Sequence, residues 1–330
     1  MSRRSIRVFI QAFLTAQQTI LVGGQAIIEG VMMRVPGAYA IAVRNPQGEI
    51  ITRRQEFTSL TEKIAIFKKP VLRGMIALFE SMKMGIGTLN ESAEIAYEED
   101  SSAEMTLKDK VLSVLGTLLA LTIGLGLFFV IPLFVTGNLL HLSETAFTFN
   151  IVSGIIRIIL FLAYLWGISL LDDVKRLFQY HGAEHKTVYT FEAGKPLDIE
   201  LAKPYQTQHP RCGTSFIFIT LLSSIILFAL IDSVVKLFVG EMNLQVRLLT
   251  HFPLIPIVAG VSYEILKLSS KYRHIAWVRA LAAPGLWLQN ITTSEPDDDQ
   301  LTVALESLKF AFGDDFEKYQ GKSYVAEAID

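Results

Sequence analysis

The 330-residue chain has little of three features that mark common classes of protein. It contains a single cysteine, Cys212, which excludes an internal disulfide and gives no sign of an oxidising compartment. Its 30 Lys and Arg and 32 Asp and Glu residues give a formal charge of −2, so no nucleic-acid partner is expected. Charged residues make up 19% of the chain, below the roughly 25% of an ordinary soluble domain.

Apolar sequence is what the chain has in excess. Hydrophobic residues make up 51% and the mean hydropathy is +0.40, which predicts an integral membrane protein surrounded by a lipid bilayer. The first apolar run has no charge and is long enough to cross a hydrocarbon core of about 30 Å. The runs predict a mainly α-helical fold with about four transmembrane helices, at residues 111–135, 151–171, 214–231 and 248–265.

The basic residues predict how these helices are oriented. Residues 1–110 contain 14 Lys and Arg, residues 172–213 contain 6 and residues 266–330 contain 7, whereas residues 136–150 contain none. Because Lys and Arg gather on the cytoplasmic side, both termini and the central loop are expected there. The predicted organisation is an N-terminal cytoplasmic or interfacial region (1–110), a transmembrane hairpin (111–171), a cytoplasmic loop (172–213), a second transmembrane hairpin (214–265) and a C-terminal cytoplasmic or interfacial region (266–330).

The N-terminal region is predicted to contain a β-hairpin. Residues 38–44 and 49–55 read as strands and flank Asn45-Pro-Gln-Gly48, which is a turn sequence. Two strands alone are marginally stable, so the hairpin is expected to pack on another element. Residues 23–34, which mix strand formers with glycines, precede it. Helices at the membrane surface are expected at residues 8–22, 67–97 and 272–290, and an amphipathic helix at 300–312 after the acidic stretch 295–299.

Charged residues in or beside the spans need separate explanations, because an ionised group in a bilayer is costly. Arg157, Asp232 and Lys236 are interpreted as anchors near the outer surface, with Asp232 and Lys236 paired four residues apart. Glu264 lies near the cytoplasmic end of the fourth span. It is a candidate metal ligand, a group that orients a ligating histidine, or a charge that reaches a nearby lysine.

The central loop begins with the pattern His181-Gly-Ala-Glu184-His185. On a helix, spacings of three and four residues place these three side chains on one face. Two imidazoles so spaced can hold a metal ion, and the carboxylate can ligate it or act as a general base. The pattern is the inverse of the zinc-peptidase signature His-Glu-x-x-His. The alternative is a polar helix end with solvated histidines.

A second cluster, His209-Pro-Arg211-Cys212, ends the same loop. His-x-x-Cys is a chelating spacing, and imidazole and thiolate are good ligands for Zn²⁺. Both clusters adjoin a predicted span, so the spans can bring them together. The alternatives are a turn histidine before proline and a small buried thiol. The sequence therefore predicts a zinc site made by most of His181, His185, His209 and Cys212.

The role of such a metal depends on the number of ligands. Four protein ligands would make a closed structural site, whereas three would leave a position for water. In the second case Glu184 would be the general base, and Arg211 or Lys186 could stabilise an oxyanion. A third alternative is a Cys212 nucleophile activated by His209 without metal.

Four blocks of the sequence together resemble the YqhQ-like family of bacterial membrane proteins: residues 23–34, 178–186, 209–216 and 292–297. The family is described as predicted metal-dependent enzymes. The resemblance implies a bacterial inner-membrane location. It also implies that the following residues occupy the family's motif positions: Glu29, Arg34, His181, Glu184, His185, His209, Arg211 and Cys212. One departure is Val35, where a glycine would be expected before the proline.

Two functions are therefore predicted. The first is a membrane-embedded zinc hydrolase that acts at the cytoplasmic face on a peptide, another amide or a lipid-linked substrate. The second is a non-enzymatic scaffold or assembly factor for membrane proteins, stapled by a structural His₃Cys zinc site. A transporter is not favoured, because the spans carry few charges and no broken half-helices. The sequence leaves the oligomeric state open.

Overall fold

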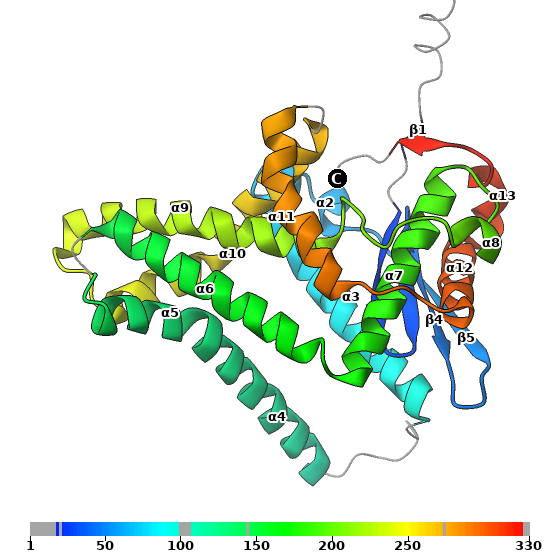
Figure 1. The fold of residues 1–330 in the computed structure, drawn as a ribbon, viewed down its shortest axis with the longest axis horizontal. Coiled ribbons are helices and arrows are strands. Elements are labelled where there is room, and N and C mark those ends of the chain that lie inside the picture. Colours follow the sequence, from blue (N-terminus) through cyan, green and yellow to red (C-terminus); the bar gives the residue numbers. More distant parts are fainter. Residues whose placement is uncertain (1–17, 20–21, 99–106, 143–144, 273–274, 326–330) are drawn as a thin grey trace, which may run out of the picture.

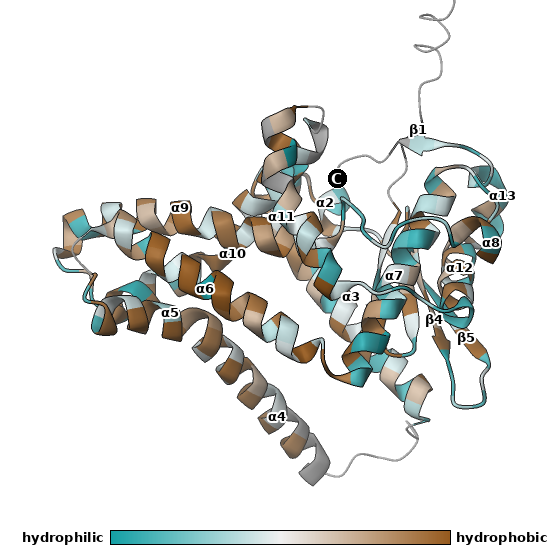
Figure 2. Ribbon diagram, in the orientation of Figure 1, coloured by the Kyte–Doolittle hydropathy of each residue, from teal (hydrophilic) through white to brown (hydrophobic). Residues whose placement is uncertain are grey.

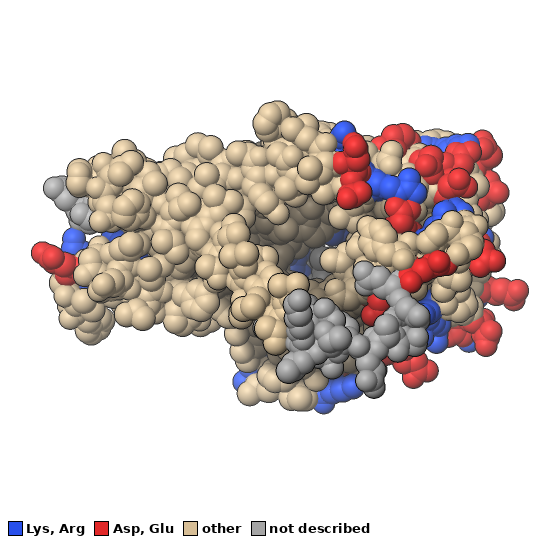
Figure 3. Space-filling model, turned by 90° about the horizontal axis from the view of Figure 1, so that it is seen from below, with Lys and Arg blue, Asp and Glu red and all other residues tan. Residues whose placement is uncertain are grey.

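A computed structural model describes residues 18–19, 22–98, 107–142, 145–272 and 275–325. The molecule is mainly helical and is built from two parts placed side by side, a bundle of long helices and a β-sheet covered by helices (Figure 1). Apolar residues dominate the bundle and polar residues dominate the sheet part (Figure 2). The Lys, Arg, Asp and Glu side chains gather over the sheet part, and the flank of the bundle is almost free of them (Figure 3).

A four-stranded antiparallel sheet confirms and extends the predicted hairpin. Its strands lie in the order β2 (Gly23–Ile27), β3 (Gly30–Val35), β4 (Ala38–Arg44) and β5 (Ile50–Glu56). The hairpin is the β4–β5 pair, and its turn is closed by a hydrogen bond from the Gly48 amide to the Asn45 carbonyl of 2.9 Å. The glycine-rich residues before it form β2 and β3, which supply the expected packing partner.

Helices cover both faces of this sheet. Because side chains alternate between the faces of a strand, Ala38, Ala40 and Ala42 of β4 face one core and Ile41 and Val43 face the other. The first face packs against α7 (Asp172–Glu192) and α12 (Asp298–Phe312), and the second against α3 (Leu72–Tyr97). The small side chains of β4 let α12 lie close to the strand.

The amphipathic helix predicted at 300–312 is observed as α12, which begins two residues earlier, inside the acidic stretch. The Asp297 side chain accepts a hydrogen bond from the Gln300 amide, and the Gln300 side chain accepts one from the Asp297 amide. This capping box satisfies two amides that a helix start leaves unpaired. The shorter elements of this part are α2 (Leu60–Lys63), η1 (Ala65–Lys68), α8 (Ile199–Ala202), η4 (Gly313–Asp315), α13 (Phe316–Tyr319) and the parallel pair β1 (Gln18–Thr19) and β6 (Tyr324–Val325).

Within the described residues, four helices are long and apolar enough to cross a membrane, as the sequence predicts. The first is continuous through α4 (Leu107–Leu125), η2 (Gly126–Val130), α5 (Ile131–Phe134) and η3 (Val135–Leu139). The others are α6 (Ala146–Ile168), α9 (Gly213–Val239) and α10 (Leu244–Lys271), and α11 (Ala276–Thr292) follows. The candidate spans within these four helices are 23 to 27 residues long, which exceeds the ~20 residues that a hydrocarbon core requires.

Two of the predicted anchors are wrong. Asp232 and Arg157 are buried inside the bundle, and Asp232 contacts Asn150, Arg247 and His251 from neighbouring helices. The predicted surface helix at residues 8–22 lies mostly outside the described residues, apart from β1 and Val22. The helix expected at 67–97 begins at Leu72, because residues 65–68 form the short η1 segment.

Candidate functional site

Helix α7 carries the first histidine cluster on the face that its spacing predicts. Asp172 and Asp173 lie in its first turn, where negative charge favours the helix dipole. The middle of the helix is buried against the sheet, and Glu184 and His185 are buried with it. A polar cluster so deeply buried has to be satisfied by its neighbours.

Two glycines let other segments approach α7. A Cβ on Gly24 of β2 would lie 2.2 Å from the Met32 carbonyl and 3.1 Å from Glu184 Cγ. A Cβ on Gly182 would lie 2.1 Å from the Ser294 carbonyl oxygen, and the Ser294 amide donates to the Phe178 carbonyl at 2.9 Å. The segment that follows α11 is therefore held against α7 at the level of the histidines.

Replacing Gly182 with Ala is expected to destabilise the protein by about 1–3 kcal/mol, because the added methyl group overlaps a backbone carbonyl. Gly87 of α3 is the matched control, since a Cβ there meets nothing within 4 Å. Its replacement by Ala is expected to raise stability by about 0.5–1 kcal/mol. Thermal unfolding of both variants in detergent tests this. Equal melting temperatures would contradict the close approach.

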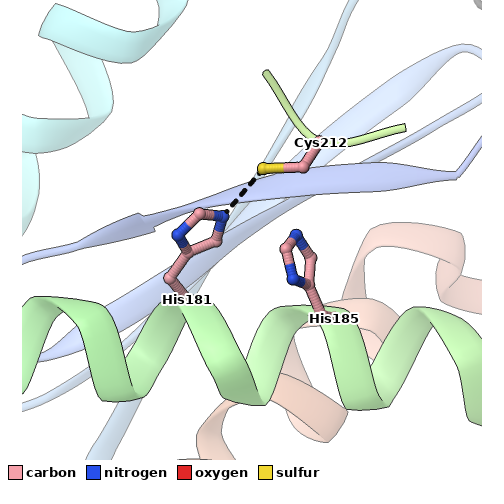
Figure 4. A group of neighbouring side chains, drawn as sticks. All are labelled: His181, His185 and Cys212. Carbon is pink, nitrogen blue, oxygen red and sulfur yellow. Dashed lines mark hydrogen bonds between the residues drawn. The ribbon is translucent and has the colours of Figure 1, made fainter. Parts of the chain in front are cut away.

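Backbone carbonyls fix the orientation of both imidazoles. His181 Nδ1 donates to the Thr292 carbonyl at 2.7 Å, and His185 Nδ1 donates to the Thr207 carbonyl. The Nε2 atoms are thereby left as lone-pair donors, as is usual for histidines that bind metals. Both rings project from α7 toward Cys212, which precedes α9, and His181 Nε2 lies 3.2 Å from its Sγ (Figure 4).

The two histidines and the cysteine could hold a metal ion. One ligand atom from each of His181, His185 and Cys212 lies within 4.8 Å of the other two. Tetrahedral zinc, with bonds of about 2.1 Å to nitrogen and 2.3 Å to sulfur, places its ligand atoms about 3.4–3.6 Å apart. The separations and the oriented imidazoles therefore fit such an ion after small side-chain movements.

Glu184 lies directly beside this group. Its Oε2 is 3.3 Å from His185 Nε2, and its side chain is 6% exposed. Burial raises the pKa of the Glu184 carboxyl, while the nearby His181, His209 and Arg211 oppose the shift. Burial also lowers the pKa of the His185 imidazole, which favours its neutral form. A carboxyl with a raised pKa beside the neutral His185 imidazole is suited to accept and release a proton.

His209 is close to the group but has other contacts. Its ring centroid is 5.4 Å from that of His185, its Nδ1 accepts from the Arg211 amide at 3.4 Å, and its Nε2 lies 3.7 Å from a Glu192 carboxylate oxygen. Arg211 forms an ion pair with the same carboxylate. His209 and Arg211 therefore both contact the Glu192 carboxylate, which lies next to the group of His181, His185 and Cys212.

Lys186 and Glu264 lie outside the group. The Lys186 ammonium donates to the Lys203 carbonyl at 2.6 Å and pairs with Glu295 at 2.5 Å, so it joins three segments of the sheet part. The Glu264 carboxylate pairs with Arg73 and accepts from the Val71 amide at 3.2 Å. Glu264 therefore ties α10 to α3.

Two residues of the site were not predicted. Glu192 lies seven residues after His185, and this spacing places it on the same helix face, so the heptad pattern could have identified it. Gln289 of α11 accepts from the His209 amide at 2.7 Å and donates to the His209 carbonyl at 2.9 Å. Nothing local in the sequence indicates that contact, because the two residues are 80 positions apart.

These features define a class of protein in which four candidate membrane-spanning helices adjoin a helix-covered sheet with a His/Cys cluster. The chain belongs to the family described as "Protein of unknown function (DUF1385)", which matches residues 69–314. It is 34% identical over 305 residues to "Uncharacterized protein YqhQ" of Bacillus subtilis (strain 168), covering 86% of this chain and 90% of that protein. No solved structure shows a significant match. The predicted relationship to the YqhQ-like family is confirmed. Neither name states an activity, so the metal-dependent enzyme stays a prediction.

Proposed function

We propose that the chain is a metal-dependent hydrolase of the bacterial cytoplasmic membrane, with its site on the cytoplasmic side. The observation that carries this proposal is the convergence of His181, His185 and Cys212 beside the buried carboxyl of Glu184. The four apolar helices support a bilayer environment, and the excess of Lys and Arg outside the 136–150 loop supports cytoplasmic termini.

In this reaction His181, His185 and Cys212 would hold zinc, which lowers the pKa of a bound water to about 7. Glu184 accepts a proton as water oxygen attacks the substrate carbonyl carbon. The bond from carbon to the leaving nitrogen or oxygen then breaks, and Glu184 returns the proton to that leaving atom. The Arg211–Glu192 pair positions His209 next to the group, and burial excludes bulk water.

A group of three protein ligands favours a catalytic zinc site over a closed structural zinc site. The closed alternative needs His209 as the fourth ligand, yet the group whose ligand atoms converge is His181, His185 and Cys212, and His209 Nε2 lies 3.7 Å from a Glu192 carboxylate oxygen. Three protein ligands leave one position for water, as in catalytic zinc sites. The scaffold function therefore has less support than the hydrolase.

Metal analysis of the full chain, purified in detergent, tests the proposed site. We expect one zinc ion per wild-type chain and a nearly complete loss in His185→Ala. His141→Ala is the matched control, because His141 is an exposed histidine far along the chain from the group, and it should retain the metal. Full metal content in His185→Ala would overturn the site.

The reaction itself is tested with the metal removed and restored. A panel of peptide, simple amide and lipid-linked amide or ester substrates is offered to the wild-type chain before chelation, after chelation and after addition of zinc. We expect turnover of at least one substrate to disappear on chelation and to return with zinc. A metal-free chain that hydrolyses at the original rate would contradict the proposal.

A further inference from the structure

A cavity of about 510 Å³ lies where α3, the start of α9 and the end of α10 meet the sheet part. Its volume is in the range of small-molecule sites. Apolar side chains form its wall, namely Ala77, Leu78, Phe216 and Leu266. Gly213 also lines it, and this residue directly follows Cys212 of the His/Cys group.

Cations outnumber carboxylates around this cavity. Arg34, Lys68 and Lys267 line it, together with Arg73, whose charge is paired with Glu264, against Glu62 and Glu80. The Glu80 carboxylate accepts hydrogen bonds from the Ser59 hydroxyl at 2.7 Å and from the Leu60 amide at 2.6 Å. These bonds hold Glu80 at the start of α2. The cavity therefore joins a positive edge to an apolar wall.

Arg34 is the residue that points to a ligand. Its guanidinium carbon lies 4.6 Å from the centre of the Phe57 ring, which holds the group in place at the cavity. Across the described parts of the chain, no side chain or carbonyl forms a hydrogen bond or ion pair with this guanidinium, and the carboxylates of Glu80 and Glu62 act on it only at longer range. A half-buried arginine usually pairs its donors with an anion, so an anionic ligand would complete the site.

We propose that this cavity binds an anionic phospholipid, with its phosphate at Arg34 and the upper part of its chains along the apolar wall. The cavity lies at the end of two candidate spans, which is the level of the lipid head groups if the bundle crosses a bilayer. The flanking η1 segment has the exposed apolar Ile66 beside Lys68 and Lys69, a composition typical of segments at an anionic membrane surface.

This binding goes beyond the proposed hydrolysis and is measured without turnover. The full chain in detergent is titrated with phosphatidylglycerol or phosphatidylcholine, and lipid adducts are counted by native mass spectrometry. We expect the wild-type chain to hold one phosphatidylglycerol at least about tenfold more tightly than phosphatidylcholine. In Arg34→Ala this preference should disappear. Arg53→Ala, which removes a β5 guanidinium that is paired with Glu91 of α3, should behave as the wild type.

A second variant keeps the test decisive if Arg34→Ala folds poorly. Ala77→Phe fills the cavity with an apolar ring and should abolish the tightly held adduct of either lipid. Equal binding of both lipids by the wild type, or an unchanged preference in Arg34→Ala, would overturn the proposal. Displacement of phosphatidylglycerol by an equal concentration of inorganic phosphate would also overturn it, because the site would then recognise a free anion.

Discussion

Replacing Glu184 with Gln is expected to lower turnover in the proposed hydrolysis by about 10²–10⁴-fold, the usual contribution of a positioned general base. The amide has nearly the same size as the carboxyl and its oxygen can still accept the hydrogen bond from the Gly24 amide, so the packing of α7 against β2 should persist. It cannot take a proton from water. The three proposed ligand side chains are unchanged, and the zinc content should therefore equal that of the wild-type chain.

The measurement compares kcat and zinc content for Glu184→Gln and for a control, Glu306→Gln. Glu306 is a partly exposed carboxylate of α12 that pairs with Lys309, outside the group. The control should keep both turnover and metal. If Glu184→Gln binds zinc and hydrolyses at the wild-type rate, Glu184 is not the base. If it loses zinc, Glu184 is a ligand and the proposed division of roles is wrong.

The fold was largely predictable where the signal is local. Four uncharged or nearly uncharged runs identify the spans, and a turn sequence between two alternating segments identifies the β4–β5 hairpin. Strands β2 and β3 were not predicted, because glycines weaken their pattern and their pairing depends on a sheet formed elsewhere. The third span was predicted to end before Asp232, yet α9 continues to Val239, because residues of other helices compensate that charge.

The site was predictable to a similar degree. The helical period places His181, Glu184 and His185 on one face, and the adjoining span brings Cys212 to them. The carbonyls of Thr207 and Thr292, which orient the two imidazoles, belong to segments remote from α7 in sequence. Such contacts depend on tertiary packing and produce no periodic pattern in the sequence. Arg34 matched a motif position, but its role at a cavity depends on α3 and α10.

A second polar cluster, buried within the bundle, joins three helices. Asp232 of α9 forms an ion pair with Arg247 of α10, and it accepts hydrogen bonds from His251 Nε2 of α10 at 2.6 Å and from the Asn150 side-chain amide of α6 at 2.8 Å. The Arg247 guanidinium lies 3.4 Å from the centre of the Phe149 ring. Asp232, Arg247 and His251 are at most 1% exposed. A charge so enclosed is stable only with its partners, so this cluster holds α6, α9 and α10 together.

Replacing Asp232 with Asn is expected to destabilise the bundle by about 3–5 kcal/mol, because it leaves the Arg247 cation buried without its carboxylate. The stability is measured by reversible unfolding of the full chain in mixed detergent. Asp315→Asn, which breaks an exposed pair with Lys318, is the control and should leave the transition almost unchanged.

The double variant Asp232→Asn/Arg247→Met separates the loss of an attraction from the cost of an unpaired cation. Methionine is apolar and removes the buried charge, so the double variant should be more stable than Asp232→Asn alone. Additive losses from the two substitutions would show that Asp232 and Arg247 stabilise the helices independently. A loss for Asp232→Asn as small as for Asp315→Asn would show that the cluster does not hold the helices together.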